Sequence, residues 1–581
     1  MKRINFVALL LVFTVFFSAF FSGFSFTFAV ESPEEVAGDV NGDWKVSSAD
    51  YLLLKQIFRG KQTTARMEER GDLNGDWRIT SADYLLLKRI FAGFSVSLKK
   101  RVLEPQPAVS DPGDPISYKV SGVFSSDMVL QRDKIIQVWG WSSDVGGYIY
   151  GEFMGEKRYA QIDSSGEWML KFSPKEYTAE GQTLTIGPKN GKQTVFENVL
   201  VGDVWIVSGQ SNAEFYFRDM AAYFTEVNDL IDETDAIRLY RVDKGDAYRG
   251  NVLAVSGQQD DVVNASYRWT RTTADTVDIF SAVGYMFVKE LSSRVDVPQG
   301  IIMAAAGGCV INDFMDPKTG AKFPATGSFW PERQAIYKYF LAPFRYMTFQ
   351  GILFYQGESD NRWADQYSYM LESCVKGWRD AFDSTFSFYN IQCTSHSALA
   401  ANPEWKGLPF LRAAQLDAYY RIPNSYLIST VDAGYRLRPL DGPEEDYAHP
   451  FDKKTIGIRA ANIALSQLYG LEGYDYCTVC CPIPEQVNWY DDYVLIRFKN
   501  AGDGLQAYGG SLKGFEILQN NKTLVKTKAI FIDRNTVKID LNAANRKVIG
   551  ICYGIAHSAL LEEANLVNSA QIPCPTFCFY K

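Results

Sequence analysis

The sequence predicts a multidomain protein in which a central α/β domain with a mainly parallel sheet is flanked by two β domains. Three observations predict this layout. Between residues 200 and 472, apolar strands alternate with helical segments, a pattern typical of a parallel sheet. Residues 116–199 and 473–581 are instead short alternating runs separated by turn residues. Near the N-terminus, one segment recurs at an offset of 33 residues, which indicates a duplicated unit.

Composition and charge restrict the class of protein. The chain has 581 residues, which suggests about four domains. Hydrophobic residues make up 46% and charged residues 22%, as in ordinary globular proteins. The net charge of −9 and the pI near 5.2 argue against a nucleic-acid-binding protein, which would normally be basic.

Residues 1–29 are expected to form a signal peptide. Two basic residues begin the segment, no charge follows before Glu31, and Thr27 and Ala29 form a small-residue cleavage site. The apolar run is long enough for an uncleaved membrane anchor to be the alternative, but interrupting serines and a glycine favour cleavage. We therefore expect a secreted protein without a membrane segment after cleavage.

The repeat has the spacing of a calcium loop. In both copies, side chains with oxygen atoms stand at loop positions 1, 3, 5, 9 and 12, and position 7 can contribute a backbone carbonyl. A helix is expected after each loop; the alternative is an acidic turn before a helix. The expected ligands are Asp39, Asn41, Asp43, Lys45 (carbonyl), Ser47 and Asp50 in the first loop, and Asp72, Asn74, Asp76, Arg78 (carbonyl), Thr80 and Asp83 in the second.

With these two loop-helix units, residues 37–95 resemble a type I dockerin of cellulosomal enzymes. The resemblance implies structural Ca²⁺ and a cohesin domain as partner. It also implies that loop positions 10 and 11 and the following helix bind the cohesin, and these positions are occupied by Ser48, Ala49, Lys55, Ser81, Ala82 and Lys88. The near-identical halves imply a pseudo-twofold surface. Residues 96–115 are rich in proline and polar residues, so we expect an extended linker.

The body of the chain supplies the other predicted elements. In the first β domain, which should be sandwich-like, strands are expected at 135–141, 147–153 and 167–172. In the α/β domain, we expect strands at 201–207, 300–306 and 351–355 and helices at 218–232, 280–295 and 330–346. In the C-terminal β domain, strands are expected at 494–498, 529–532, 537–541 and 548–553.

The chain has nine cysteines, an odd number. Cys477 and Cys480, together with Cys574 and Cys578, have spacings that allow a zinc site or a local disulfide. Nine cysteines are too few to build a fold of this size from disulfides. Buried free thiols are the third alternative, and the pattern alone does not decide among them.

Ser211 is the candidate nucleophile. It follows the apolar strand 201–207 and stands where that strand turns into a helix. A serine in such a turn has an exposed hydroxyl and backbone N–H groups nearby, which a nucleophile and an oxyanion both need. A serine that only caps the helix would have the same local sequence, so the motif needs a partner.

His449 is the candidate base, because the chain has only three histidines. Asp446 lies three residues before it and can hold the second ring nitrogen, although Asp432 and Asp441 are rivals for that role. A histidine in an acidic loop without a catalytic role is the alternative.

The turns after two other strands contain candidate oxyanion donors. Gly307 and Gly308 follow strand 300–306, and Gln356 follows strand 351–355. Because sites in open α/β sheets lie at the carboxyl ends of the strands, these groups should lie near Ser211. Tight-turn glycines and a capped strand end are the alternative.

Residues 116–581 resemble the sialate O-acetylesterase family within the SGNH hydrolases. The matching motifs are MVLQR at 128–132, VWGW at 138–141, GDVW at 202–205, GQSN at 209–212, YQGES at 355–359, LRAAQ at 411–415, HP at 449–450, KGFE at 513–516 and NL at 565–566. The resemblance implies a three-layer α/β catalytic domain. It also implies Ser211 as nucleophile, His449 as base, Asp446 as its orienter, and an oxyanion hole made by Ser211, Gly308 and Gln356. Asp360 stands where the family commonly has asparagine.

Together, these features predict a secreted, cellulosome-associated esterase that removes O-acetyl groups from carbohydrate. The dockerin favours plant cell-wall polysaccharide such as xylan or xyloglucan, and O-acetylated sialic acid is the alternative substrate. The chemistry needs no metal, so Ca²⁺ belongs to the dockerin. The rival functions are a non-catalytic carbohydrate-binding component of the cellulosome, a serine peptidase and a lipase.

Overall fold

The computed structural model describes most of the chain from residue 116 onward. The described residues are 50, 53–54, 83, 87, 116–231, 233–242, 261, 268–324, 330, 333–394, 407–433, 449–542, 544, 547–555 and 561–581. The chain forms two compact units, Met1–Ala108 and Val109–Lys581. No helix among the described residues is long and apolar enough to span a bilayer.

In the first unit, the described residues are helical and buried. Asp50 and Asp83, which stand at position 12 of the two loops, are both helical and fully buried. Leu54 and Leu87 are also fully buried on these helices. The signal peptide, the linker, the cohesin-binding positions and the other expected calcium ligands lie outside the described residues.

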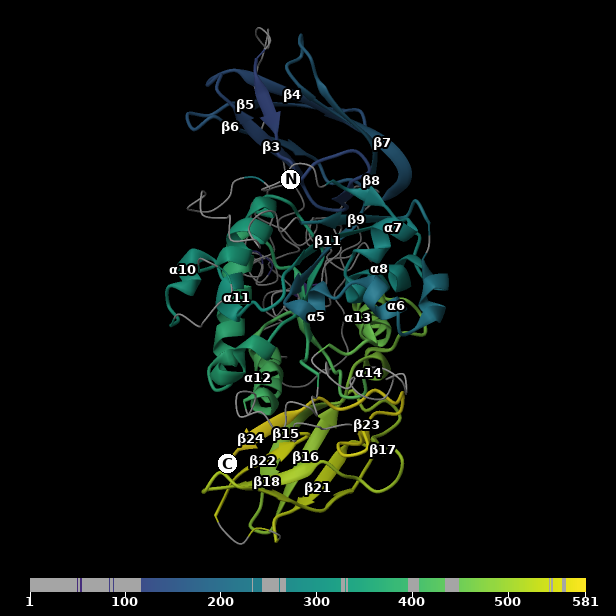
Figure 1. Ribbon diagram of the computed structural model, residues 1–581, viewed down its shortest axis with the longest axis vertical. Coiled ribbons are helices and arrows are strands. Elements are labelled where there is room, and N and C mark those ends of the chain that lie inside the picture. Colours follow the sequence, from purple (N-terminus) through teal and green to yellow (C-terminus); the bar gives the residue numbers. More distant parts are fainter. Residues whose placement is uncertain are drawn as a thin grey trace, which may run out of the picture. The chain divides into compact units, whose positions relative to one another are not determined.

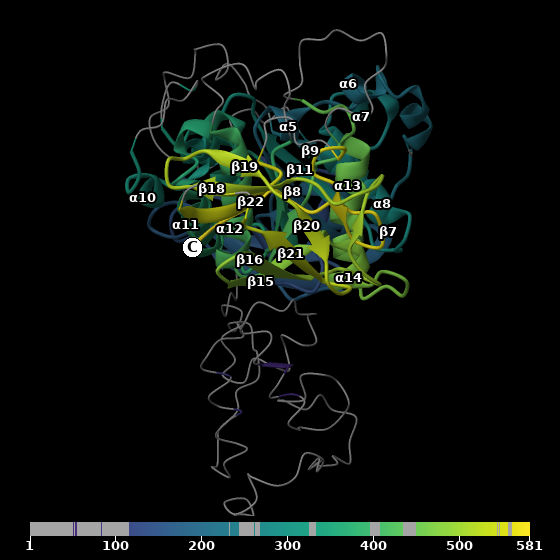
Figure 2. The same cartoon turned by 90° about the horizontal axis from the view of Figure 1, so that it is seen from below.

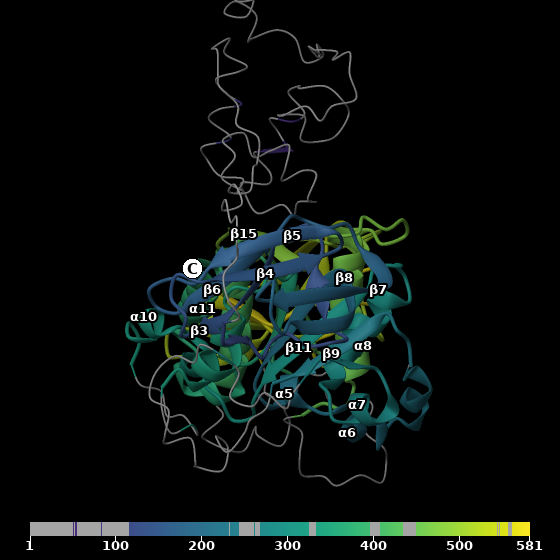
Figure 3. The same ribbon diagram turned by 90° about the horizontal axis from the view of Figure 1, so that it is seen from above.

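The second unit begins with a β domain of two sheets around one core. One sheet has the order β1-β3-β6 and the other contains β4, β5, β7 and the first part of β8 (Figures 1 and 3). The three expected strands are present. The bounds are β1 Tyr118–Val120, β2 Val129–Gln131, β3 Ile136–Ser142, β4 Tyr148–Phe153, β5 Glu156–Gln161, β6 Glu167–Phe172, β7 Thr178–Gly187 and β8 Thr194–Gly209.

Strand β8 connects the first β domain to the α/β domain. Its first part pairs with β7 in antiparallel fashion, and its second part is parallel to β11 (Gln299–Ala305) and β12 (Gly351–Tyr355). The boundary expected between residues 199 and 200 therefore falls inside a continuous strand. As a consequence, the β domain is built onto the strand that leads into Ser211.

The central sheet has the order β10-β9-β11-β8-β12-β13-β14 and is parallel except at β10. Its side chains alternate between two cores. Trp205 and Val207 belong to the core that contains helices α8 and α13, while Val204 and Ile206 belong to the core that contains α11 and α12. The bounds are β9 Ile237–Arg241, β10 Thr270–Arg271, β13 Ser387–Ile391, β14 Ser425–Ile428, α8 Ala282–Ser292, α11 Tyr367–Ala381, α12 Leu408–Arg421 and α13 Lys453–Gln467. Figure 1 shows these two pairs of helices on opposite sides of the sheet.

Two expected helices differ from the structure. The segment 218–232 forms a short helix, α6 (Phe217–Ala221), and a separate 3₁₀ helix, η1 (Thr225–Leu230). The segment 330–346 forms a π-helical turn, η4 (Tyr337–Leu341), and a 3₁₀ turn, η5 (Ala342–Phe344). Pro343 lies in η5, and its missing N–H and ring prevent a regular α-helix from continuing through it. The other short helices are α5 Ser211–Glu214, α7 Ala274–Asp278, α9 Ile311–Phe314, α10 Pro317–Gly320, η6 Glu358–Trp363 and α14 Tyr476–Val479.

The C-terminal β domain has two four-stranded sheets, β15-β16-β21-β20 and β19-β18-β22-β24 (Figure 2). All four strands expected here are present. The core between the sheets includes Leu416 of α12 and Leu427 of β14, so it is continuous with the α/β domain. The bounds are β15 Ile483–Trp489, β16 Tyr493–Lys499, β17 Gln506–Ala507, β18 Phe515–Gln519, β19 Leu524–Lys526, β20 Ala529–Phe531, β21 Thr536–Asp540, β22 Val548–Tyr553, β23 Leu566–Val567 and β24 Phe577–Tyr580.

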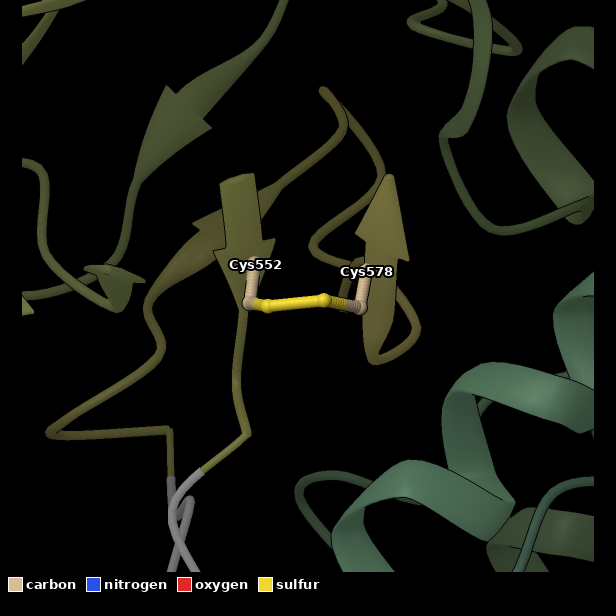
Figure 4. Close-up of a disulfide and its surroundings, with 2 residues drawn as sticks. All are labelled: Cys552 and Cys578. Atoms are coloured by element: carbon tan, nitrogen blue, oxygen red, sulfur yellow. A yellow bond between two sulfur atoms is a disulfide. The ribbon is translucent and has the colours of Figure 1, made fainter. Parts of the chain in front are cut away.

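A disulfide joins Cys552 of β22 to Cys578 of β24, which face each other in the antiparallel pair (Figure 4). Because Cys578 is used here, the set of four cysteines considered for zinc does not form a site. Of the other members of that set, Cys480 and Cys574 are buried free thiols and Cys477 is an exposed one.

Candidate active site

The site lies where three parallel strands end at the same level. Gly209 at the end of β8 is in register with Ala305 of β11 and Tyr355 of β12. Gly209 has a φ of 133°, and a Cβ atom there would lie 2.1 Å from the carbonyl oxygen of Tyr355. Only glycine allows this close approach, so the sequence places glycine directly before the turn that carries Ser211.

Ser211 and His449 meet at this edge of the sheet. The Oγ atom of Ser211 lies 2.6 Å from Nε2 of His449, although the two residues are 238 positions apart in the chain. Both side chains are half-buried. The ring of Phe215 stacks on the imidazole at a centroid distance of 6.3 Å, which restrains its orientation. A serine hydroxyl bonded to a histidine nitrogen in this way can be activated for nucleophilic attack.

Three carboxylates are candidates for orienting His449, and one of them lies among the described residues. Asp446 and Asp441 lie outside the described residues. Asp432 is described, and both its oxygens accept hydrogen bonds from the guanidinium of Arg459, at 2.6 and 2.5 Å. This pairing commits Asp432 to Arg459, so Asp446 and Asp441 stay as the predicted candidates for the orienter.

The two glycines after β11 have different environments. The N–H of Gly307 donates to Oε2 of Glu214 at 2.7 Å and is therefore occupied. Among the described residues, nothing accepts from the N–H groups of Gly308 and Ser211. A Cβ atom at Gly307 would lie 3.5 Å from Cβ of Ser211, so the turn adjoins the candidate nucleophile. Gly308 is thus the better candidate of the two for an oxyanion donor.

Gln356 does not present its amide to this space. The side chain is fully buried, and Nε2 donates to Oδ2 of Asp360 at 2.6 Å, with the carbonyl of Cys309 and Oε1 of Gln210 each at 3.2 Å. Its Oε1 accepts from the hydroxyl of Tyr367 at 2.7 Å. The expected role of Gln356 as an oxyanion donor is therefore not supported by its hydrogen bonds, because its two N–H groups already face internal acceptors.

Three further residues at the site were not singled out from the sequence. Lys453 is fully buried, and its Nζ donates to Oδ1 of Asn212 at 2.7 Å and to the carbonyl of Pro450 at 2.5 Å. Asn212 in turn donates to Oε1 of Glu358 at 2.7 Å. Lys453 thereby connects the residue after Ser211 with the residue after His449. The third residue is Gln210, discussed below.

Comparison with known proteins supports both sequence resemblances. Residues 37–92 match the type I dockerin domain, and residues 201–436 match the family described as carbohydrate esterase, sialic acid-specific acetylesterase. The sialate O-acetylesterase of Mus musculus is 23% identical over 503 residues, which cover 75% of this chain and 89% of the relative. The sialate O-acetylesterase of Homo sapiens is 24% identical over 408 residues, covering 64% and 74%.

The fold also has a solved counterpart. A carbohydrate acetylesterase from Xanthomonas citri superposes with a TM-score of 0.67 at 24% identity, covering 80% of this chain and 99% of that structure. The likeness establishes a carbohydrate acetylesterase-like fold in a multidomain chain. Together, the family matches and the relatives indicate an acetylesterase, a carboxylic ester hydrolase that is similar to the sialate O-acetylesterases, with a type I dockerin match at residues 37–92.

Proposed function

We propose that the protein is a secreted, cellulosome-associated serine esterase that removes O-acetyl groups from plant cell-wall polysaccharide such as xylan or xyloglucan. The observation that carries the proposal is the 2.6 Å distance between Oγ of Ser211 and Nε2 of His449. The pair lies at the carboxyl edge of a parallel sheet, where ligands bind in open α/β folds.

The proposed mechanism has two steps. His449 takes the hydroxyl proton of Ser211 while Oγ attacks the acetyl carbonyl carbon, and the N–H groups of Ser211 and Gly308 bind the resulting oxyanion. His449 then protonates the departing sugar oxygen, which leaves an acetyl group on Ser211. In the second step, His449 deprotonates a water molecule that attacks the acetyl group, and acetate and free Ser211 are released. Asp446 would hold the other ring nitrogen throughout.

The N-terminal unit would bind Ca²⁺ and a cohesin. The carboxylates of Asp50 and Asp83 are fully buried at position 12 of the two loops, a position that supplies an oxygen ligand in calcium loops. The remaining ligands would be the other loop residues named above. When bound, Ca²⁺ would order the loops, and Ser48, Ala49, Lys55 and their counterparts in the second copy would contact the cohesin.

The dockerin favours a plant polysaccharide substrate, because cohesin binding would attach the enzyme to a cellulosome. O-Acetylated sialic acid is the second candidate, since the curated relatives are named sialate O-acetylesterases. A non-catalytic carbohydrate-binding role is disfavoured by the Ser211–His449 hydrogen bond, which such a role would not need.

The test compares acetate release by the full-length protein with release by Ser211→Ala on acetylated xylan, acetylated xyloglucan and an O-acetylated sialic acid. Ser293→Ala, at an exposed position, is the matched control. We expect the Ser211→Ala variant to lose nearly all activity, because no other group can form the acetyl-enzyme, while the control keeps it. Release that persists in Ser211→Ala would overturn the proposed nucleophile, and preference for the sialic acid would overturn the proposed substrate.

A further inference from the structure

We infer that Gln210 supplies the side-chain donor of the oxyanion hole, in place of Gln356. The inference rests on the proposed function, because it assigns a further catalytic residue to the same reaction. Gln210 immediately precedes Ser211 and is almost fully buried, with 4% of its surface exposed. Its side chain reaches from the turn at Ser211 to the loop after β12.

The orientation of the Gln210 amide is fixed by its oxygen. Oε1 lies within 3.3 Å of the backbone N–H groups of Gly357 and Ser359 and within 3.2 Å of Nε2 of Gln356. Both backbone groups can only donate, so the atom that they face must be the acceptor. If the amide of Gln210 were flipped, its NH₂ group would face the backbone N–H groups of Gly357 and Ser359. Two donors cannot bond each other, so Oε1 must be the atom that faces them.

This orientation leaves the nitrogen of Gln210 without an internal acceptor. No residue in the described part of the chain accepts from Nε2, and the atom is not among the buried polar atoms sealed from solvent. Buried amides are normally hydrogen-bonded, so a donor kept open in a nearly buried side chain is available to a ligand. Gln356 is the opposite case, since its nitrogen faces three acceptors.

The Gln210 amide belongs to the residue directly before Ser211, and its oxygen faces the loop after β12. Gln356 contacts both Oε1 of Gln210 and the carbonyl of Cys309, so one side chain links this amide to the turn after β11. The backbone N–H groups of Gly308 and Ser211 stand at the same two strand ends and also lack acceptors among the described residues. With the amide of Gln210, these two N–H groups would give the three donors that a tetrahedral oxyanion can use.

Gln356 then acts as a positioning residue. It is held by Tyr367 through its oxygen and by Asp360 through its nitrogen. From this fixed place, it donates to the oxygen of Gln210 and thereby helps to fix which end of that amide is left without an internal partner. The glutamine predicted from the sequence therefore supports the donor rather than serving as the donor.

The decisive comparison is between Gln210→Glu and Gln210→Met in the full-length enzyme. Glutamate keeps an oxygen for the two backbone N–H groups but replaces the nitrogen with a second oxygen, whereas methionine removes both functions. If Gln210 donates to the oxyanion, both variants lose about 10²–10³ in kcat with little change in KM. If Gln210 only anchors the loop, Gln210→Glu retains activity and Gln210→Met does not, which would overturn the inference.

Two further measurements test the role of Gln210 separately from the proposed function. Ser211→Ala is assayed in parallel: an inactive Ser211→Ala with a fully active Gln210→Glu rejects the inference alone, whereas an active Ser211→Ala rejects the proposed function. If the Gln210 variants do not fold, a structure of the intact enzyme phosphonylated on Ser211 by an aryl phosphonate decides the matter. We expect Nε2 of Gln210 within about 3.2 Å of the phosphonyl oxygen. Nε2 of Gln356 at that place would overturn the inference.

Discussion

At the scale of single residues, Asp360 is the group whose charge is most affected by the fold around the site. It is fully buried, and its Oδ2 accepts from the N–H of Ile311 at 2.7 Å and from Gln356 at 2.6 Å. Its Oδ1 has no hydrogen-bond partner among the described residues. Burial raises the pKa of this carboxyl to about 7, against the two hydrogen bonds, which lower it.

This pKa makes stability depend on pH. Between about pH 4 and pH 7 the unfolded chain releases a proton from Asp360 that the native protein keeps, so the free energy of unfolding falls as the pH rises. Each rise of one pH unit in this range lowers the free energy of unfolding by about 1.4 kcal/mol, and above pH 7 it falls no further. Asp360→Asn keeps an acceptor oxygen and does not titrate. We therefore expect its Tm to rise relative to the parent from pH 4 to 7 and then stay level.

Scanning calorimetry from pH 4 to pH 8 measures this difference in Tm. Asp491→Asn, which changes an exposed carboxyl, is the control, and the difference between its Tm and that of the parent should not change with pH. An equally flat difference for Asp360→Asn would contradict the raised pKa.

Residue-level patterns predicted part of the site and missed the rest for physical reasons. Ser211 and His449 could be found because nucleophile and base are restricted to few residue types and the chain has only three histidines. Lys453 was missed because lysine is almost always on the surface, and only the folded chain shows it buried against Asn212. Likewise, which of two glutamines keeps an open amide depends on hydrogen bonds between distant loops.

At the scale of elements, the sequence pattern predicted strand positions better than strand partners. The strand expected at 351–355 has the same bounds in the structure, because its apolar run begins after Gly351 and ends before the polar residue Gln356. The continuity of β8 was not predictable, since a change from antiparallel to parallel neighbours leaves no mark in the strand's own residues. The helix expected at 330–346 was wrong, because Pro343 cannot continue a regular α-helix and lies in a 3₁₀ turn.

The disulfide between β22 and β24 carries a prediction about stability. It closes a loop with a sequence separation of 26 residues and ties down the last strand of the chain. Cross-linking a loop of this length restricts the unfolded chain, which stabilises the native state by about 3 kcal/mol. The double variant Cys552→Ala/Cys578→Ala should therefore unfold at a clearly lower urea concentration. Cys477→Ala, at an exposed free thiol, is the control and should not. Equal urea midpoints for both variants would show that the bond does not stabilise the fold.

At the scale of the whole molecule, the proposed attachment and the proposed catalysis belong to separate compact units. The calcium-loop carboxylates of Asp50 and Asp83 lie in Met1–Ala108, whereas Ser211 and His449 lie in Val109–Lys581. The proposed proton transfers run only between groups of the second unit. Because the two units are separately compact, unfolding of the first need not disturb the second.

Removing Ca²⁺ should therefore abolish cohesin binding and leave acetate release intact. With EDTA in excess, we expect capture of the full-length protein by an immobilised type I cohesin to be lost, because the loops lose the cation that balances their buried carboxylates. Acetate release from acetylated xylan should stay within about twofold, since a folding unit that lacks the calcium loops carries Ser211 and His449.

The double variant Asp50→Ala/Asp83→Ala should reproduce the EDTA result without any chelator, which controls for effects of EDTA on the polysaccharide. If EDTA abolished acetate release while this variant kept it, a cation would act in the second unit. If cohesin capture survived both treatments, the calcium-dependent role proposed for the first unit would be wrong.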